Sequence, residues 1–300
     1  MKTVYARRVS VGLCIFFVAS LLGSSQVARA FTLGDSANFS VLYEGGGVNH
    51  LNFNNGTITG NIGIGDPTGT NTAILAINGP ASLNGDALFG GTTNYTINGV
   101  VTINGTISGN HTNVQGDLNY LNTLSTTLGA ETGSNVTFNI SNGATQTVNA
   151  ASGAVDGNGN RVFTVTSVNF VNGATLKING NGVDDVVFNI NLNANFNGRI
   201  LLTGGLTPDD VLFNILGGAN LTGGHTLSIS ANGATETGTF LDPNGSMQIN
   251  NSLLIGHFFG GDSHDDQIVS GAEIMIPEPS SVALAAAGVL LLGLFIRRRH

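Results

Sequence analysis

The sequence predicts an all-β protein, folded as a right-handed parallel β-solenoid with one short amphipathic helix. Three observations predict this class: short apolar runs that end in Asn-Gly, a heptad that returns after 25 residues, and a single segment with helical periodicity. A β-sandwich is the alternative, because regularly spaced short strands also fit Greek-key connections.

Asn-Gly closes repeated strand-like units along the chain. Residues 95–99 (YTING), 100–105 (VVTING) and 176–180 (LKING) are examples. Asn and Gly tolerate positive φ, so each pair is suited to end a strand and turn the chain. Such pairs also favour ordinary hairpins, and only repetition at a longer interval distinguishes a solenoid.

The heptad at residues 184–190 (DDVVFNI) returns at residues 209–215 (DDVLFNI), a shift of 25 residues. This interval is typical of one solenoid turn, in which equivalent residues stack on successive coils. Residues 136–140 (VTFNI) look like a third copy in the same phase. We therefore expect two stacked sets: interior Phe138, Phe188 and Phe213, and an amide ladder of Asn139, Asn189 and Asn214.

One segment has a helical period. Its apolar residues recur at intervals of three and four: Val114, Leu118, Leu121, Leu124 and Leu128. We predict a helix from Leu118 to Leu128, capped by Asp117, with its leucine face packed on the solenoid.

The N-terminus has the pattern of a secretory signal. Lys2, Arg7 and Arg8 precede a hydrophobic core at residues 9–22, and Ala28 and Ala30 form a small-x-small cleavage site. We predict a signal peptide over residues 1–30, with an uncleaved N-terminal membrane helix as the alternative. The only cysteine, Cys14, lies in this segment, so the exported protein has no thiol for a disulfide or a metal site.

The C-terminus has three parts in a fixed order. Pro277, Glu278 and Pro279 precede the uncharged residues 280–296, which are followed by Arg297, Arg298, Arg299 and His300. A run of roughly 17 apolar residues is at the lower limit for crossing a bilayer, and the basic cluster after it favours the cytoplasm. This order resembles the PEP-CTERM sorting signal, which implies an inner-membrane intermediate, recognition by an exosortase, and transfer to the cell surface or the extracellular space. Residues 277–300 are thus predicted to be a sorting signal with a transmembrane helix.

Residues 31–276 form the predicted secreted domain, and they are strongly acidic. Their cations are Arg161, Lys177 and Arg199, and their acids are the 18 of the whole chain less Glu278, so the net charge is 3 − 17 = −14. Nucleic acids bind to clustered Lys and Arg, so this composition excludes them as partners. Acidic residues can attract Ca²⁺, but they also serve solubility alone.

The secreted domain itself resembles a known family. It opens with residues 33–42 (LGDSANFSVL) and 60–64 (GNIGI), and it closes with residues 258–263 (FFGGDS) and 267–274 (QIVSGAEI). This order resembles the choice-of-anchor A family of secreted bacterial proteins and, more distantly, the ice-binding-type β-solenoids. The resemblance implies a β-rich surface domain in which a helix lies along a parallel stack.

The repeated acid pairs are the best candidates for catalytic residues: Asp184, Asp185, Asp209 and Asp210. One solenoid turn apart, the pairs are expected to stack, where they could act in acid/base chemistry or share a cation such as Ca²⁺. However, the Gly-His-Gly and Arg-Ile-Lys motifs of β-helical galacturonases are missing. We predict no catalytic residues and no required cofactor, and we interpret both pairs as solvated turns.

Two further groups of residues have the composition of a binding site. His257, His264, Asp262, Asp265 and Asp266 lie within ten residues, but they lack a metal-binding spacing, so an exposed polar loop is the favoured interpretation. Thr-x-Thr, typical of ice-binding rows, occurs at residues 57–59, 145–147, 164–166 and 235–237. Their spacings share no common coil length, which argues against a regular row.

The function predicted from these observations is that of a non-enzymatic exported protein of the cell surface or extracellular matrix. The resemblance to exosortase-sorted proteins further implies a link to exopolysaccharide and biofilm. Signal peptidase and an exosortase are its expected partners during export, and an exopolysaccharide is its expected partner outside the cell. The alternatives are a β-helical polysaccharide-degrading enzyme and an ice-binding or adhesin-like recognition protein.

Overall fold

The computed structural model describes residues 31–45, 49–66, 74–216, 225–261 and 264–276. All of the strands described and both hydrophobic clusters lie within residues 31–276, so this part of the chain carries a core of its own. None of the helices in the described ranges has the length and apolar character needed to cross a membrane.

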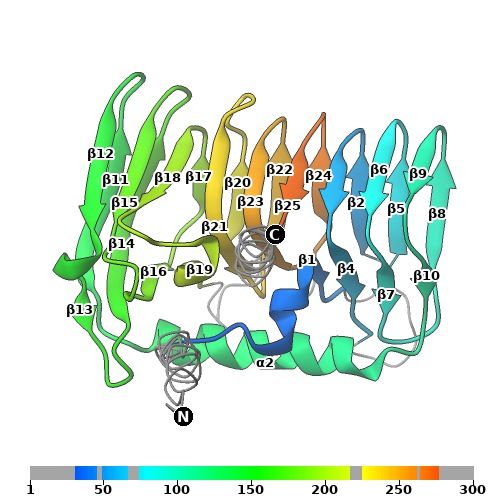
Figure 1. Cartoon of the computed structure of the whole chain (residues 1–300), viewed down its shortest axis with the longest axis horizontal. Helices are drawn as coiled ribbons and strands as arrows, with labels where there is room; N and C mark the ends of the chain where they lie inside the picture. Colours follow the sequence, from blue (N-terminus) through cyan, green and yellow to red (C-terminus); the bar gives the residue numbers. More distant parts are fainter. Residues whose placement is uncertain (1–30, 46–48, 67–73, 217–224, 262–263, 277–300) are drawn as a thin grey trace, which may run out of the picture.

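The chain winds into coils that stack along one axis, and each coil contributes strands to three faces (Figure 1). The helix face, which is covered by a helix, contains β1 (Phe39–Tyr43), β4 (Asn61–Ile64), β7 (Ala87–Phe89), β10 (Ile107–Ser108), β16 (Val186–Ile190), β19 (Val211–Ile215), the starts of β11 (Ser134–Ile140) and β14 (Arg161–Phe170), and the ends of β21 (Thr235–Asp242) and β23 (Leu253–Gly260).

The second face, here called the amide face, contains β2 (His50–Asn54), β5 (Ile74–Asn78), β8 (Tyr95–Asn98), β17 (Ala194–Phe196), β20 (Thr226–Ile229), β22 (Ser246–Asn250), β24 (Asp266–Val269) and the ends of β11 and β14. The third, the tail face, contains β3 (Thr57–Thr59), β6 (Ala81–Asn84), β9 (Val101–Ile103), β12 (Thr145–Asn149), β15 (Thr175–Asn179), β18 (Arg199–Thr203), β25 (Glu273–Met275) and the starts of β21 and β23. Short elements join these strands: 3-10 helices η1 (Gly34–Asn38), η2 (Ala150–Ser152) and η3 (Pro208–Asp210), and strand β13 (Ala154–Val155).

The strand ladders confirm the solenoid and exclude the β-sandwich. Every pairing in the described part of the chain is parallel, except the short antiparallel contact of β13 with β14. Parallel neighbours require a crossover between them, and here the rest of each coil supplies it. A Greek-key sandwich would instead pair its strands antiparallel.

The 25-residue repeat predicts one step of the stack correctly. Val186 pairs with Val211 and Ile190 with Ile215, and all residues between them keep this register. The prediction that residues 136–140 are a third copy in the same row is wrong. Phe138 pairs with Val168, and Asn139 pairs with Asn169 on the amide face. From Thr137 onwards, β11 lies on the amide face. The similar sequence of residues 136–140 therefore occupies a different face from β16 and β19.

Stacked phenylalanines form the centre of the core. Phe163, Phe188, Phe213 and Phe240 occupy one row, with ring centroids 5.1, 5.2 and 4.7 Å apart and nearly parallel planes. Phe138 is also interior, and its ring meets Phe188 edge-on at 5.4 Å, so its predicted burial is confirmed although its row is different. Each coil buries apolar side chains from all three faces into this one cluster.

Helix α2 (Thr112–Gly129) covers the helix face. Its buried Val114, Leu118, Leu121 and Leu128 pack on outward-facing apolar side chains of that face, which confirms the predicted leucine stripe. The helix begins six residues earlier than expected from a start at Leu118. Asp117 therefore lies within it and is not the cap, and His111 precedes it without a side-chain capping bond.

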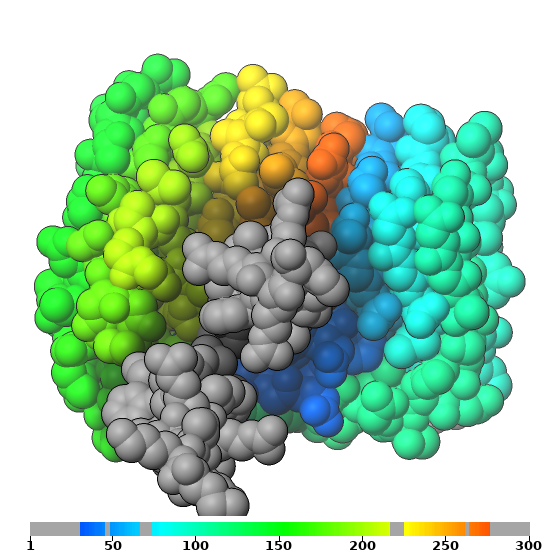
Figure 2. All heavy atoms as spheres, viewed as in Figure 1, coloured from blue at the N-terminus to red at the C-terminus, as the bar shows by residue number. Residues whose placement is uncertain are grey.

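The helix also explains the order of the coils. At about 1.5 Å per residue, its 18 residues span about 27 Å, which corresponds to five or six coils at ~4.8 Å each. Strands β1 to β10 form the coils before the helix. After the helix, the chain begins new coils with β11 at the opposite end of the stack, and these coils advance towards the first ones. Its last coil then pairs with its first, through β23 with β1, β24 with β2 and β25 with β3. In Figure 2 these late, orange coils lie beside the early, blue coils.

Candidate functional site

The two predicted acid pairs lie at the corner before β16 and β19, but the structure gives them separate partners. Asp184 is buried, and its carboxylate accepts a hydrogen bond from Arg161 Nε at 3.2 Å. The carbonyl oxygen of Asp185 accepts from the Arg161 backbone amide at 2.7 Å. Arg161 thus ties this pair to the neighbouring coil.

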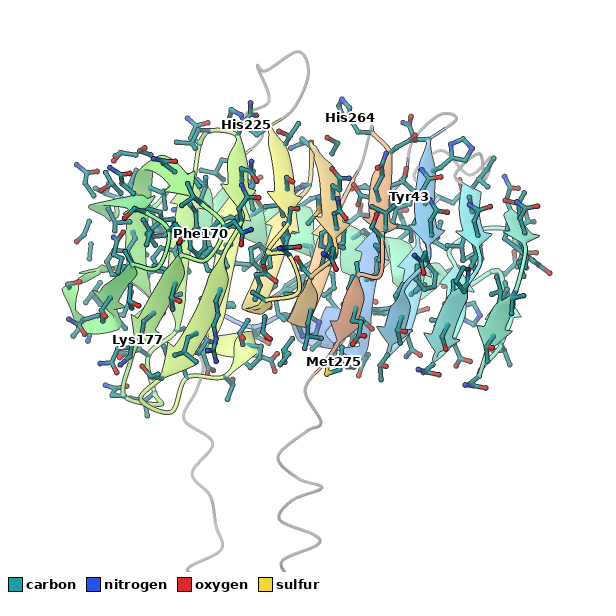
Figure 3. The ribbon with its side chains drawn as sticks, turned by 90° about the horizontal axis from the view of Figure 1, so that it is seen from above. Tyr43, Phe170, Lys177, His225, His264 and Met275 are labelled. Atoms are coloured by element: carbon teal, nitrogen blue, oxygen red, sulfur yellow. The ribbon has the colours of Figure 1, made fainter. Side chains whose placement is uncertain are left out.

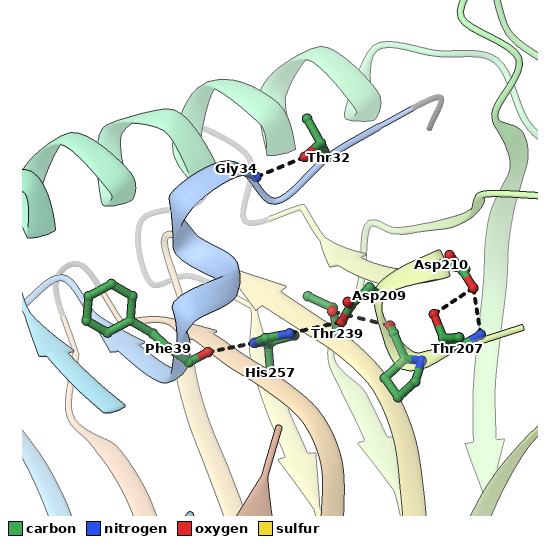
Figure 4. A network of polar contacts seen from close by, with 9 residues as sticks. Thr32, Gly34, Phe39, Thr207, Asp209, Asp210, Thr239 and His257 are labelled. Carbon is green, nitrogen blue, oxygen red and sulfur yellow. Dashed lines mark hydrogen bonds and ion pairs between the residues drawn. The ribbon is translucent and has the colours of Figure 1, made fainter. Parts of the chain in front are cut away.

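Asp209 and Asp210 hold a different part of the fold together (Figure 4). Asp210 is the third residue of a capping box whose N-cap is Thr207, and the backbone N–H and the hydroxyl of Thr207 both donate to its carboxylate, at 2.6 and 2.7 Å. Asp209 Oδ1 lies 3.1 Å from His257 Nε2, while His257 Nδ1 lies 2.6 Å from the carbonyl oxygen of Phe39. Buried His257 thereby joins the first coil to η3.

No shared cation site arises from these acids. Within the ranges that the structure describes, no group of three or more His, Cys, Asp or Glu side chains is placed to hold a metal ion. The predicted cluster around His264 is also divided. His257 and Asp266 are buried rather than in an exposed loop, while Asp265 lies at the surface, 3.6 Å from His50 Nδ1. Asp262 falls outside the described residues.

The amide face brings together side chains that lie far apart in the sequence. Strand register places seven outward positions in one row across successive coils: Asn195, Ser228, Gln248, Gln267, Asn52, Ala76 and Thr96. A second row runs beside it: Asn250, Val269, Asn54, Asn78 and Asn98. The alternating residues of these strands, such as Leu51 and Phe53, point into the core.

Hydrogen bonds between neighbouring coils order these side chains. Asn98 Nδ2 donates to Asn78 Oδ1 at 3.0 Å, and Asn78 Nδ2 in turn donates to Asn54 Oδ1. At the other end of the stack, Asn169 Nδ2 donates to Asn139 Oδ1 at 2.9 Å. Such ladders hold the side chains in one direction, so their remaining donors and acceptors are oriented before any ligand arrives.

The amide face points away from the C-terminal end of the described domain. In Figure 3, His225 and His264, which precede amide-face strands β20 and β24, lie on the side opposite Lys177 and Met275 of the tail face. The described chain ends beside the tail face, where the Ile276 backbone amide donates to the carbonyl oxygen of Thr59 at 3.4 Å. The amide face and the end of the described chain thus lie on different sides of the stack.

A shallow groove lies where the amide face turns into the tail face. Its volume is about 330 Å³, near the lower limit for small-molecule sites. Thr57, Ser82, Thr102 and Glu273 are among the residues that line it. Pro80, Ala81 and Val100 also line the groove, so it is not a continuation of the polar rows of the amide face.

The Thr-x-Thr segments do not form a continuous row. Residues 57–59, 145–147 and 235–237 all lie on the tail face, in β3, β12 and β21, whereas residues 164–166 lie in β14. Two coils separate β21 from β3. Their outward positions are occupied by other residues: Leu253, Ile255, Glu273 and Met275. The irregular spacing in the sequence therefore corresponds to an interrupted row in space.

Comparisons with known proteins add two findings. The model of the PEP-CTERM protein-sorting motif matches residues 276–299. The chain carries an exosortase sorting signal. It is therefore an exported protein, sorted to the cell surface or the extracellular space. The proposed residues Pro277, Glu278, Pro279 and Arg297 to Arg299 fall in this match but outside the described residues, as do Ala28 and Ala30 of the predicted signal peptidase site.

Solved structures of similar fold are ice-binding proteins. That of the Antarctic ascomycete Antarctomyces psychrotrophicus is 14% identical, covers 82% of this chain and 98% of its own, and has a TM-score of 0.51. That of an Antarctic Flavobacteriaceae bacterium is 17% identical, covers 82% of this chain and 47% of its own, and has a TM-score of 0.53. At such identities the likeness shows a shared fold. The comparison with curated proteins finds no match.

Sequence reasoning missed the amide face and a buried acid. The outward residues of the amide face come from separate coils of unequal length, so only strand register aligns them. Glu236, inside Thr-Glu-Thr, points into the core on the tail face and is fully buried. Desolvation by burial raises its pKa to about 9. The sequence signal that could have identified Glu236 as buried is the alternation of inward and outward side chains along β21, in which Glu236 occupies an inward position.

Proposed function

We propose that this exported protein binds a neutral extracellular polysaccharide through the amide face and does so without catalysis. The observation that carries the proposal is the row of outward side chains from Asn195 to Thr96, which is continuous across seven consecutive strands. Six of these seven side chains carry an amide or a hydroxyl group, and none of them is charged.

The chemistry of this row suits sugar hydroxyl groups. Amides and hydroxyls both donate and accept hydrogen bonds, as sugar hydroxyls do. Parallel strands place equivalent side chains ~4.8 Å apart, a spacing comparable to the advance of one sugar residue in an extended glycan. Because the domain has a net charge of −14 but this row has none, a neutral polymer fits it better than an anionic one. We propose that the polymer is the host's own exopolysaccharide, in a biofilm or envelope.

The non-catalytic part of the proposal is supported by how the acid pairs are used. Asp184 is paired with Arg161, Asp209 with His257, and Asp210 with Thr207. Replacing Asp185 and Asp210 together with Asn is expected to leave any turnover of extracted polysaccharide unchanged, and reducing-end release measures it. Loss of turnover in this variant, with the fold intact by circular dichroism, would instead establish the polysaccharide-degrading alternative.

Ice binding is the second candidate, because solved ice-binding proteins share the fold. The amide face fits a lattice poorly, since short Ala76 lies in the same row as long Gln248 and Gln267. We expect no thermal hysteresis from residues 31–276 at millimolar concentration. A freezing gap, with faceted crystal growth, would favour ice over sugar.

Isothermal titration with the host's purified exopolysaccharide tests the main proposal. Residues 31–276 are expected to bind with a favourable enthalpy, because new hydrogen bonds to sugar hydroxyls dominate the contact. The affinity should depend little on salt, since the row from Asn195 to Thr96 carries no charge. No heat at any accessible concentration, or binding abolished by moderate salt, would contradict the proposal.

The sorting signal makes a separate prediction about the mature ends. We expect the intact mass of protein recovered outside the cell to correspond to a chain that starts at Phe31 and ends near Pro277 to Pro279. Processing by signal peptidase and the exosortase would produce these ends. A mass that extends to His300, found only in the membrane fraction, would show that the tail is a permanent anchor.

A further inference from the structure

The stack has one open end. Strands β8, β9 and β10 form the last coil there, and in the described part of the chain each pairs on one side only, with β5, β6 and β7 respectively. Tyr95 and Ile97 of β8 continue the inward rows of Leu75 and Ile77, which are completely buried. Tyr95 is nevertheless 44% exposed and Ile97 43% exposed, because none of the coils that the structure describes lies beyond β8.

The opposite end is better covered. In its last coil, Phe138 and Ile140 are buried although β11 also lacks a neighbour beyond it. The Gln146 side chain folds over this end, and its Nε2 donates to the carbonyl oxygen of Thr137 at 2.7 Å. The two ends of the solenoid are therefore unlike, and the core reaches the surface mainly at β8.

The open end also lacks the usual protection of a strand edge. Natural edges carry charged residues, prolines, bulges or a covering segment, which prevent pairing with another chain. Residues 87–110 contain no Asp, Glu, Lys, Arg or Pro. The carboxylate of Asp86 meets this coil only at Thr106, between β9 and β10, so in a domain of net charge −14 the β8 edge itself carries no charge that would repel a second copy.

We propose that two copies of this protein join end to end through this last coil. A twofold axis perpendicular to the stack brings the two β8 strands side by side and antiparallel, so that each edge supplies the donors and acceptors that the other needs. Tyr95 and Ile97 of both copies are then buried. The contact lies at the end of the stack, so the row on the amide face continues from one copy into the other.

Sedimentation equilibrium of residues 31–276 tests the dimer. The wild-type domain is expected to be a monomer–dimer mixture whose dimer fraction rises with salt, because screening weakens the repulsion between the acidic bodies. Ile97→Lys and Tyr95→Lys are expected to weaken dimerisation more than about 100-fold, since each places a charge from both copies inside the apolar contact.

The matched control is Val155→Lys, at the opposite end of the stack in β13, where Val155 is 59% exposed. This variant should dimerise like the wild type, and circular dichroism should show that all three variants remain folded. A wild-type domain that is monomeric at every concentration would overturn the proposal. So would equal weakening by Val155→Lys, which would indicate head-to-tail stacking.

Discussion

Replacing Glu236 with Gln is expected to stabilise the domain by about 3 kcal/mol at pH 7 and to have almost no effect at pH 4.5. In the folded protein Glu236 is fully buried, no hydrogen-bond partner is found for either carboxylate oxygen among the described residues, and its pKa is raised to about 9. The unfolded chain has the ordinary pKa of about 4.5. The fold therefore binds a proton that the unfolded chain releases.

The sign follows from this difference. Below the unfolded pKa both states are protonated, and the folded state is at its most stable. As the pH rises towards 9, folding must take up a proton, and stability falls by about 1.4 kcal/mol per pH unit. Glutamine carries no titrating proton, so the variant lacks this loss. Burial also raises the pKa of Asp266. In both the wild type and the variant, this group therefore adds a further fall in the unfolding free energy as the pH rises.

Urea unfolding of wild type and variant from pH 4.5 to 8.5 measures the effect. The difference in unfolding free energy should grow steadily with pH. A second variant, Glu236→Leu, copies Leu254 at the paired position of β23, and it is expected to be more stable than the wild type at every pH. A difference between wild type and the Gln variant that stays constant with pH would mean that the Glu236 carboxylate is ionised in the fold.

Replacing Asn214 with Ala is expected to destabilise the domain by about 3 kcal/mol. This buried side chain joins the helix to the solenoid. Its Nδ2 donates to the carbonyl oxygen of Ser125 at 3.0 Å and to Asn189 Oδ1 at 2.9 Å, and its Oδ1 accepts from the Ser125 hydroxyl at 2.5 Å. Alanine leaves these buried groups without their partner.

Asn139→Ala is the matched control, because Asn139 has the same Phe-Asn-Ile context but lies exposed on the amide face. Replacing Asn139 with Ala is expected to lower the free energy of unfolding by about 0.5 kcal/mol. Chemical denaturation of both variants gives the comparison. Equal costs for the two would contradict the view that Asn214 and Asn189 fasten α2 to the helix face.

The sequence predicted the stack where the coils are regular. The 25-residue repeat gave the true register of β16 with β19, and with it the buried neighbours Phe188 and Phe213 and the ladder of Asn189 with Asn214. Phe163 and Phe240 extend the same phenylalanine row, but their surroundings (RVFTV and GTFLD) share too little with the repeat to be recognised. Coil length varies, so periodicity was lost beyond one step.

Two errors had physical causes. Residues 136–140 have a sequence similar to the repeat, but most of them lie on the amide face. The chain turns between Val136 and Thr137, where the register with β14 shifts. Asp117 suggested a helix start, since Asp is a good cap, yet the helix continues to Thr112 because Val114 is buried against the helix face. Tertiary packing decided both cases.

Candidate sites were harder to predict than the fold. Acid pairs and a His-rich segment attract attention in a sequence, but here they join coils and cap short helices. The surface proposed to act is made of Asn, Gln, Ser and Thr, which are common in turns. These residues become one surface only when the last coil pairs with the first and places Gln267 beside Asn52.

The measurement that tests the central claim most directly is the affinity of a double variant, Gln248→Ala with Gln267→Ala, for the host's exopolysaccharide. The two side chains are neighbours in the row on the amide face. At about 1 kcal/mol for each lost hydrogen-bonding group, the dissociation constant should rise about 30-fold. Thr145→Ala with Thr147→Ala, on the tail face, is the matched control and should bind like the wild type. Unchanged binding by the first pair, or equal loss in both, would contradict recognition by the amide face.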